Sequence, residues 1–173
     1  MKKILILLGL LAACSSQEEP RRDGNPMAPA AAQKQSAPAD EPSRIATLTG
    51  LYEGGSAAQP NRMCIVEGKA DERRFGLVVW GGNLHSCSGS GTVTRQGGKL
   101  RLAMAGDSAC TIEATISGKT VKLPETVPSG CAYYCGARAT LGGAELTQKG
   151  TTKAAALEAK DLVGESLCGA QGG

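Results

Sequence analysis

Cysteine is the residue type in this sequence with the widest choice of chemistry, because a thiol can carry lipid, form a disulfide, bind metal or act as a nucleophile. The chain has 7 cysteines in 173 residues. Cys14 stands apart, directly after an apolar stretch, and the others lie between residues 64 and 168. An odd total implies that at least one cysteine is not paired within the chain.

The residues before Cys14 have the order of a secretory signal. Lys2 and Lys3 give a basic start, and an apolar run of residues 4–13 follows. That run is about half the roughly 20 residues that a bilayer-spanning helix needs, and it ends in small residues, as a signal peptide does. A buried N-terminal helix is the alternative, but no amphipathic pattern follows to support it.

The stretch Leu11-Ala12-Ala13-Cys14 resembles the lipobox of bacterial lipoproteins. The resemblance implies cleavage before Cys14, a diacylglyceryl group on its thiol and acylation of its amine. It also implies retention in the cell envelope, since several acyl chains anchor a protein stably. Ser15 and Ser16 stand where an aspartate would retain such a protein in the inner membrane, so we expect the outer membrane.

The remaining six cysteines then form an even set in an oxidising compartment, which predicts three disulfides. Sequence alone allows about 15 connectivities. We favour Cys64–Cys87, Cys110–Cys131 and Cys135–Cys168. The alternative is a local Cys131–Cys135 bridge, which leaves Cys110 to pair with Cys168.

Two other kinds of chemistry are less well supported by the cysteine spacing. Zinc sites use close-spaced thiolates such as CxxC, whereas Cys131 and Cys135 form a CxxxC pair that an oxidising compartment would bridge. His85-Ser86-Cys87 suggests a nucleophile with a base. Adjacent strand residues face opposite ways, however, and although Asp107 or Glu113 could orient His85, no motif marks such an arrangement. We therefore expect no catalytic residue, no metal and no cofactor.

The elements that carry these residues begin after a spacer. Residues 14–45 contain five of the eight prolines and no apolar period, which predicts a disordered tether. As a flexible coil of about 31 residues it would span roughly 30 Å. Residues 46–168 form the expected folded domain, and residues 169–173 a loose tail.

Residues 48–123 alternate between apolar and polar side chains, with glycine turns at short intervals. This pattern predicts an antiparallel meander that closes as a small barrel or sandwich. Strands are expected at residues 48–54, 62–68, 74–82, 91–96, 99–105, 109–117 and 119–124. An irregular loop and one more strand follow. Residues 151–164 predict a helix with Thr152 as its cap and an apolar stripe of Leu157, Leu162 and Val163. The fold class is therefore mainly β with a short C-terminal helix, stabilised by disulfides.

Charge and composition limit the function. Without Lys2 and Lys3 the chain has 17 basic and 16 acidic residues, which predicts neither nucleic-acid binding nor electrostatic binding to anionic lipid. We expect a non-enzymatic binding or structural domain with an envelope protein as its partner. A recognition surface is expected at Trp80 to His85 and at Tyr133-Tyr134, unless these residues serve only packing.

The opening of the folded domain resembles periplasmic protease-inhibitor barrels. Gly50-Leu51-Tyr52 matches their Gly-x-aromatic strand, and Cys64 with Cys87 would match their single early disulfide. Four further cysteines and the helical tail depart from that pattern. The resemblance implies an inhibitor of a protease as one alternative, with a lysozyme inhibitor beside it. An envelope hydrolase that uses His85 is the other alternative.

Overall fold

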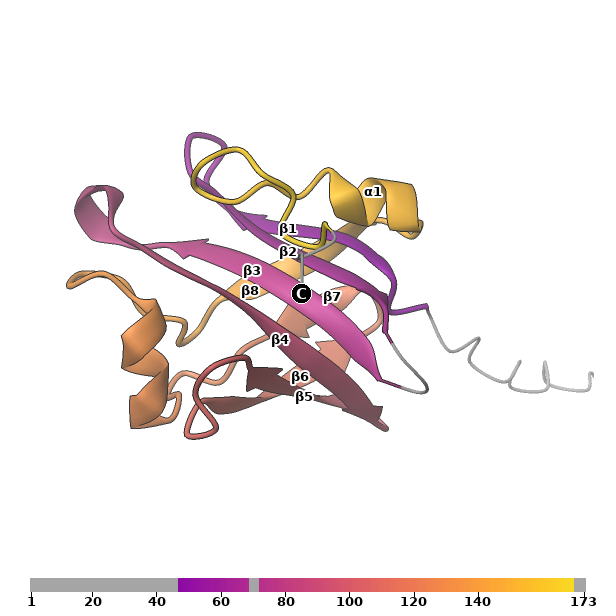
Figure 1. Cartoon of the computed structure of the whole chain (residues 1–173), viewed down its shortest axis with the longest axis horizontal. Helices are drawn as coiled ribbons and strands as arrows, with labels where there is room; N and C mark the ends of the chain where they lie inside the picture. The colour runs from indigo at the N-terminus through magenta and orange to yellow at the C-terminus, as the bar shows by residue number, and fades with distance from the viewer. Residues whose placement is uncertain (1–46, 69–71, 170–173) are drawn as a thin grey trace, which may run out of the picture. The chain divides into compact units, whose positions relative to one another are not determined.

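A computed structural model describes residues 47–68 and 72–169, so the predictions for the signal, Cys14, the tether and residues 170–173 lie outside the described residues. Within them the chain forms a closed antiparallel barrel in which each strand pairs with the next and β8 pairs with β1 (Figure 1). The described strands are β1 (Gly50–Gly55), β2 (Pro60–Glu67), β3 (Arg73–Trp80), β4 (Ser86–Gln96), β5 (Lys99–Met104), β6 (Thr111–Ser117), β7 (Thr120–Lys122) and β8 (Glu145–Gly150).

The barrel confirms the predicted meander and decides between the two architectures that alternation allowed. β4 is longer than expected, because the glycine- and serine-rich residues 86–90 pair with β3. Residues 91–96 of the same strand pair with β5. β4 thus joins β3 to β5 in the closed barrel.

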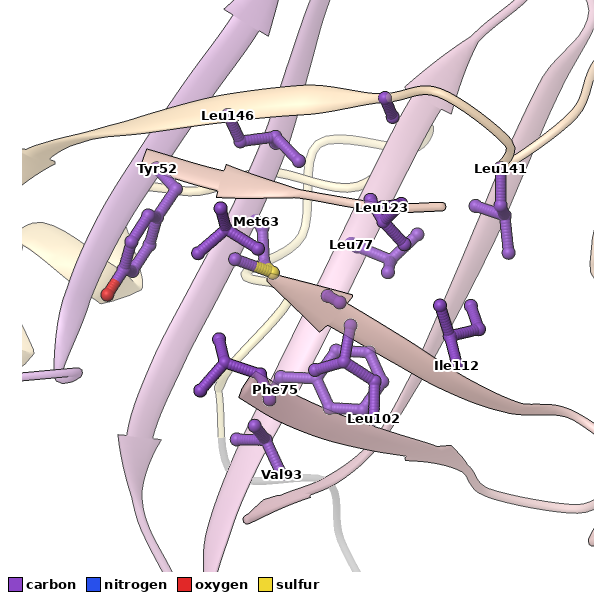
Figure 2. Close-up of a cluster of buried hydrophobic side chains, with 14 of the residues drawn as sticks. Tyr52, Met63, Phe75, Leu77, Val93, Leu102, Ile112, Leu123, Leu141 and Leu146 are labelled. Carbon is purple, nitrogen blue, oxygen red and sulfur yellow. The ribbon is translucent and has the colours of Figure 1, made fainter. Parts of the chain in front are cut away.

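The barrel interior is filled by side chains, as expected for eight strands. Alternate residues of each strand point inward and form one buried cluster, in which the aromatic residues are Tyr52 and Phe75. Figure 2 shows side chains from different strands pointing toward one another there. Small aliphatic residues fill the remaining volume, which agrees with the aromatic-poor composition.

A second, smaller cluster covers the outer face of β2 and β3. It contains Cys64, Val66 and Val78 from the strands and Ala156 and Ala159 from the C-terminal segment. The short helix α1 (Lys153–Leu157) packs on β1 and β2 at this face. Gly76 lets the chain approach closely, since a Cβ atom there would lie 2.5 Å from the carbonyl oxygen of Leu167.

The helix prediction was right about its start and wrong about its length. The Thr152 side chain accepts a hydrogen bond from the Ala155 amide and caps α1, as predicted. The helix ends at Leu157, however, and Val163 is 82% exposed. Asp161 Oδ1 accepts hydrogen bonds from the amides of Val163 and Glu165, which forms a turn in place of the predicted apolar stripe.

All six cysteines of the described residues form disulfides, and the pairing corrects our preferred connectivity. Cys110–Cys131 is present as predicted. The other two bridges are Cys64–Cys168 and Cys87–Cys135. The predicted Cys64–Cys87 and Cys135–Cys168 bridges are wrong, because Cys87 and Cys135 lie in or against the cluster inside the barrel, whereas Cys64 and Cys168 belong to the cluster on its outer face. The alternative Cys131–Cys135 bridge is wrong as well, since each of these cysteines pairs with a residue of the barrel wall or its edge.

Candidate functional site

The two ends of the barrel are built differently. We call the end with the Gly97-Gly98 and Gly118-Lys119 turns the turn end; the chain enters β1 and leaves β8 there. We call the other end the loop end, and its connections are residues 56–59, 81–85, 105–110 and 123–144. The β3–β4 connection and the 3₁₀ turn η2 (Ser129–Tyr134) lie at the left of Figure 1. Because long connections with little regular structure are usually functional, the loop end is the candidate site.

Two disulfides hold the longest connection, residues 123–144, against the barrel. Cys131 in η2 bonds to Cys110 before β6, and Cys135 bonds to Cys87 in β4. Backbone hydrogen bonds add to this, because the Gly136 amide donates to Ser86 O at 2.9 Å. The connection is therefore fixed in place, which reduces the entropy that it would lose when a partner binds.

The β3–β4 connection exposes a large apolar side chain on unusual backbone. Asn83 and Leu84 lie in the left-handed region with φ of 55° and 63°. This region is unfavourable for a bulky residue such as leucine. The Leu84 side chain is nevertheless 76% exposed, so the conformation gains no core packing. Strained backbone of this kind gathers at ligand-binding sites.

Tyr133 and Tyr134 lie in η2 and have different roles. Tyr134 donates a 2.6 Å hydrogen bond from its hydroxyl to Ala105 O, which ties η2 to the β5–β6 connection. Its ring meets the Tyr133 ring edge-on, with centroids 5.3 Å apart. Tyr133 itself is 81% exposed. Tyr134 thus supports a rigid, exposed aromatic side chain of the kind found at protein interfaces.

A hollow of about 330 Å³ lies within the same long connection. Its lining includes Val127, Ala139 and Leu141, together with the disulfide-bonded Cys131 and Cys135. Most of these groups are apolar, and the connection that forms the hollow is fixed by covalent bonds. The hollow has the size and lining to accept an apolar side chain of a partner.

His85 reaches the site but has no catalytic arrangement among the described residues. A Cβ atom placed on Gly136 would lie 3.0 Å from His85 Nδ1, so the ring packs against the long connection. No hydrogen bond to the ring occurs in the described part of the chain. Asp107 accepts instead from the Ala109 amide, and Glu113 pairs with Arg101 at 3.6 Å. Neither carboxylate is engaged with His85.

The predicted recognition residues do not form one surface. His85, Tyr133 and Tyr134 belong to the loop end, whereas Trp80 packs half-buried against the cluster on the outer face of β2 and β3. The predicted range from Trp80 to His85 includes Leu84, although the prediction named only the residues at its two ends. The signal for Leu84 was a large apolar residue after Gly81-Gly82-Asn83, outside any alternating pattern.

The turn end is closed by hydrogen bonds. The Tyr52 hydroxyl donates to Leu48 O at 2.8 Å and accepts from Gln148 Nε2 at 3.3 Å. Burial raises the pKa of Tyr52 to about 12, and the nearby Arg95 and Arg73 guanidiniums oppose that rise. A hydrogen bond from Thr49 lowers the pKa of Glu67, with a further contribution from Arg73.

No family model, curated protein or solved structure matches this chain. Within residues 47–68 and 72–169 no cluster of histidine, cysteine and carboxylate side chains could hold a metal ion. The described residues likewise include no helix long and apolar enough to cross a bilayer.

Proposed function

We propose that this chain is a lipid-anchored lipoprotein of the bacterial envelope whose barrel binds a protein partner through the loop end. The lipobox at Cys14 supports the anchor, and three disulfides support an oxidising compartment. The absence of aspartate at Ser15 and Ser16 supports the outer membrane.

The observation that carries the binding role is the pair of exposed side chains, Leu84 and Tyr133. Each is more than three-quarters exposed. Tyr133 lies on the connection that two disulfides hold, and Leu84 lies three residues before Cys87, which forms one of them. Burial of one such side chain in a partner contributes about 1.5–3 kcal/mol. A partner that offers an apolar side chain to the neighbouring hollow would match this surface. An inhibited protease or lysozyme is one partner of that kind.

The anchor is tested by substitution of Cys14 in the producing bacterium. Cys14→Ala removes the acylated thiol, so we expect loss of acyl labelling and of membrane retention. Intact-mass measurement and membrane fractionation provide the readout. Unchanged retention and mass in the variant would contradict the anchor.

The binding surface is tested by photo-crosslinking in intact cells. We place p-benzoylphenylalanine at Leu84 or at Tyr133, with Glu113 as the matched control because it is exposed in the middle of β6. We expect adducts with one common protein from positions 84 and 133 and none from position 113. Adducts that are absent, or equal from all three positions, would refute a loop-end partner.

A further inference from the structure

The charges of the barrel are separated between its two ends, although the chain is nearly neutral without its first residues. Among the described residues of the turn end, seven basic residues stand against two acidic ones, Glu67 and Glu72. The basic residues are Arg73, Arg74, Arg95, Lys99, Lys119, Lys149 and Lys153. We call these seven residues the basic rim.

The basic rim surrounds the barrel end and does not lie on one side of it. β3, β4 and β5 contribute residues through their ends at this side, and so do the β6–β7 turn, β8 and the start of α1. Arg74, Lys99, Lys119, Lys149 and Lys153 are exposed. Arg73 is partly neutralised by Glu67, whose carboxylate lies 3.5 Å from its Nε. A ring of exposed cations on one end suits a flat anionic surface.

The rest of the described chain has no such excess. Glu53 pairs with Arg62 and Glu113 pairs with Arg101 along the barrel wall. At the loop end Asp107, Glu125 and Glu145 outnumber Lys122 and Arg138. In the C-terminal segment Glu158, Asp161 and Glu165 outnumber Lys160. The positive charge of the described barrel is therefore concentrated at the turn end.

The described chain also begins at the turn end. Thr47 to Thr49 lead into β1 there, and the proposed lipid-bearing Cys14 precedes them in sequence. A lipid anchor would therefore attach the barrel by the end that carries the cations. Electrostatic attraction decays within about 8 Å at physiological salt, so the rim acts only where the barrel meets the membrane.

We propose that the basic rim docks on the anionic phospholipid surface of the membrane and holds the barrel with its loop end facing away. Headgroup phosphates are the ligands, and the side chains bind them as a diffuse charged surface. In the anchored protein the acyl chains hold the chain at the membrane. The contact of the basic rim with lipid then sets the orientation of the barrel. The orientation rests on the proposed anchor, whereas the attraction to lipid depends on the rim alone.

Vesicle binding by the unacylated protein tests the rim. The chain from residue 14 with Cys14→Ser is mixed with vesicles of 30% phosphatidylglycerol in phosphatidylcholine, and bound protein is measured by flotation. We expect binding at 50 mM NaCl, its loss at 500 mM, and none to pure phosphatidylcholine. Absence of binding to the anionic vesicles at low salt would overturn the proposal.

A pair of triple variants with equal net charge locates the surface. Lys99→Gln, Lys119→Gln and Lys149→Gln remove three rim cations, and we expect roughly 100-fold weaker binding, at about five-fold for each residue. The control triple Lys122→Gln, Arg138→Gln and Lys160→Gln removes as many cations elsewhere and should change binding less than about three-fold. Equal losses in both triples would reject the rim as the contact surface.

A soluble polyanion separates membrane binding from general affinity for phosphate. A short duplex oligonucleotide that carries the same total charge as the accessible lipid should compete weakly, because a rigid rod cannot meet all sides of a ring at once. Equal affinity for the oligonucleotide and the vesicles would overturn the membrane assignment. A failed anchor gives a different result, since Cys14 would lack acyl groups while the unacylated protein still bound anionic vesicles.

Discussion

The turn end and the loop end of this barrel close the same cylinder by different means. The turn end uses glycine turns and a buried hydrogen-bond network around Tyr52 and Gln148. The loop end uses covalent bonds, because its longest connection has little regular structure and two disulfides hold it. The turn end is cationic, whereas the loop end exposes Leu84 and Tyr133.

This difference suggests that the two ends of the barrel have separate functions. A network of satisfied hydrogen bonds stabilises the fold and leaves few groups to recognise a partner. A long connection fixed at two points can hold large apolar side chains in water without collapsing on them. The comparison predicts that damage to one end should leave the function of the other intact.

Removal of disulfides should have the largest effect and should separate the two ends. Loss of Cys110–Cys131, which closes a short loop, is expected to cost about 3 kcal/mol of unfolding free energy, and loss of Cys64–Cys168 about 4–5. Paired Cys→Ser variants and denaturant titration measure this.

The same variants also serve to test function. The Cys110–Cys131 variant should lose crosslinking from position 133 and keep vesicle binding. Loss of both functions together would contradict independent ends. Several free thiols in the unfolded, unreduced protein would contradict the pairing itself.

The Tyr52 network should give the turn end a distinct alkaline response. The folded-state pKa of Tyr52 is raised from 10.0 to about 12, so the folded state holds this proton more tightly than the unfolded chain does. Its contribution to stability is complete below pH 10 and is lost as pH rises toward 12. Tyr52→Phe should remove that part of the pH dependence.

The same substitution should lower stability at pH 7 by about 1–2 kcal/mol, because Leu48 O and Gln148 lose a partner. Thermal melts from pH 7 to pH 11.5 compare the two proteins, and Tyr133→Phe is the control because its exposed ring is outside this network. If the melting temperatures of the Tyr52 variant and the unsubstituted protein changed with pH in the same way, Tyr52 would not be the source of the alkaline response.

Leu84→Gly should move stability and binding in opposite directions. Glycine adopts φ near 63° without steric cost, so we expect unfolding free energy to stay level or rise by about 1 kcal/mol. Crosslinking from position 133 should fall, since the apolar side chain is gone. Asn83→Gly changes the neighbouring left-handed residue and keeps Leu84, so it should leave the adduct unchanged. A Leu84→Gly protein that binds its partner normally would remove Leu84 from the site.

His85→Gln should have the smallest effect of these changes. The ring packs against Gly136 and has no hydrogen bond within the described residues, so we expect a change below about 0.5 kcal/mol. Partner binding should also be nearly unchanged. A hydrolytic activity that disappeared with this substitution would instead favour the alternative in which the protein is an enzyme.

The sequence by itself determined the class of fold and most strand positions. Apolar alternation has a period of two residues, so it is visible within each segment whatever the segment packs against. In β2, for example, Met63 and Ile65 point into the barrel, while Cys64 and Val66 lie in the cluster on its outer face. The Thr152 cap was visible for the same reason, since a helix start depends on neighbouring residues.

Only the tertiary structure decided which cysteines pair and where the charges gather. Cys64 and Cys168 are 104 residues apart, and they meet because the C-terminal segment crosses the outer face of β2 and β3. The near-neutral composition predicted no attraction to anionic lipid, but closure of the barrel brings cations from several strands to one end. Contacts between distant segments depend on the path of the whole chain, and local sequence patterns do not encode that path.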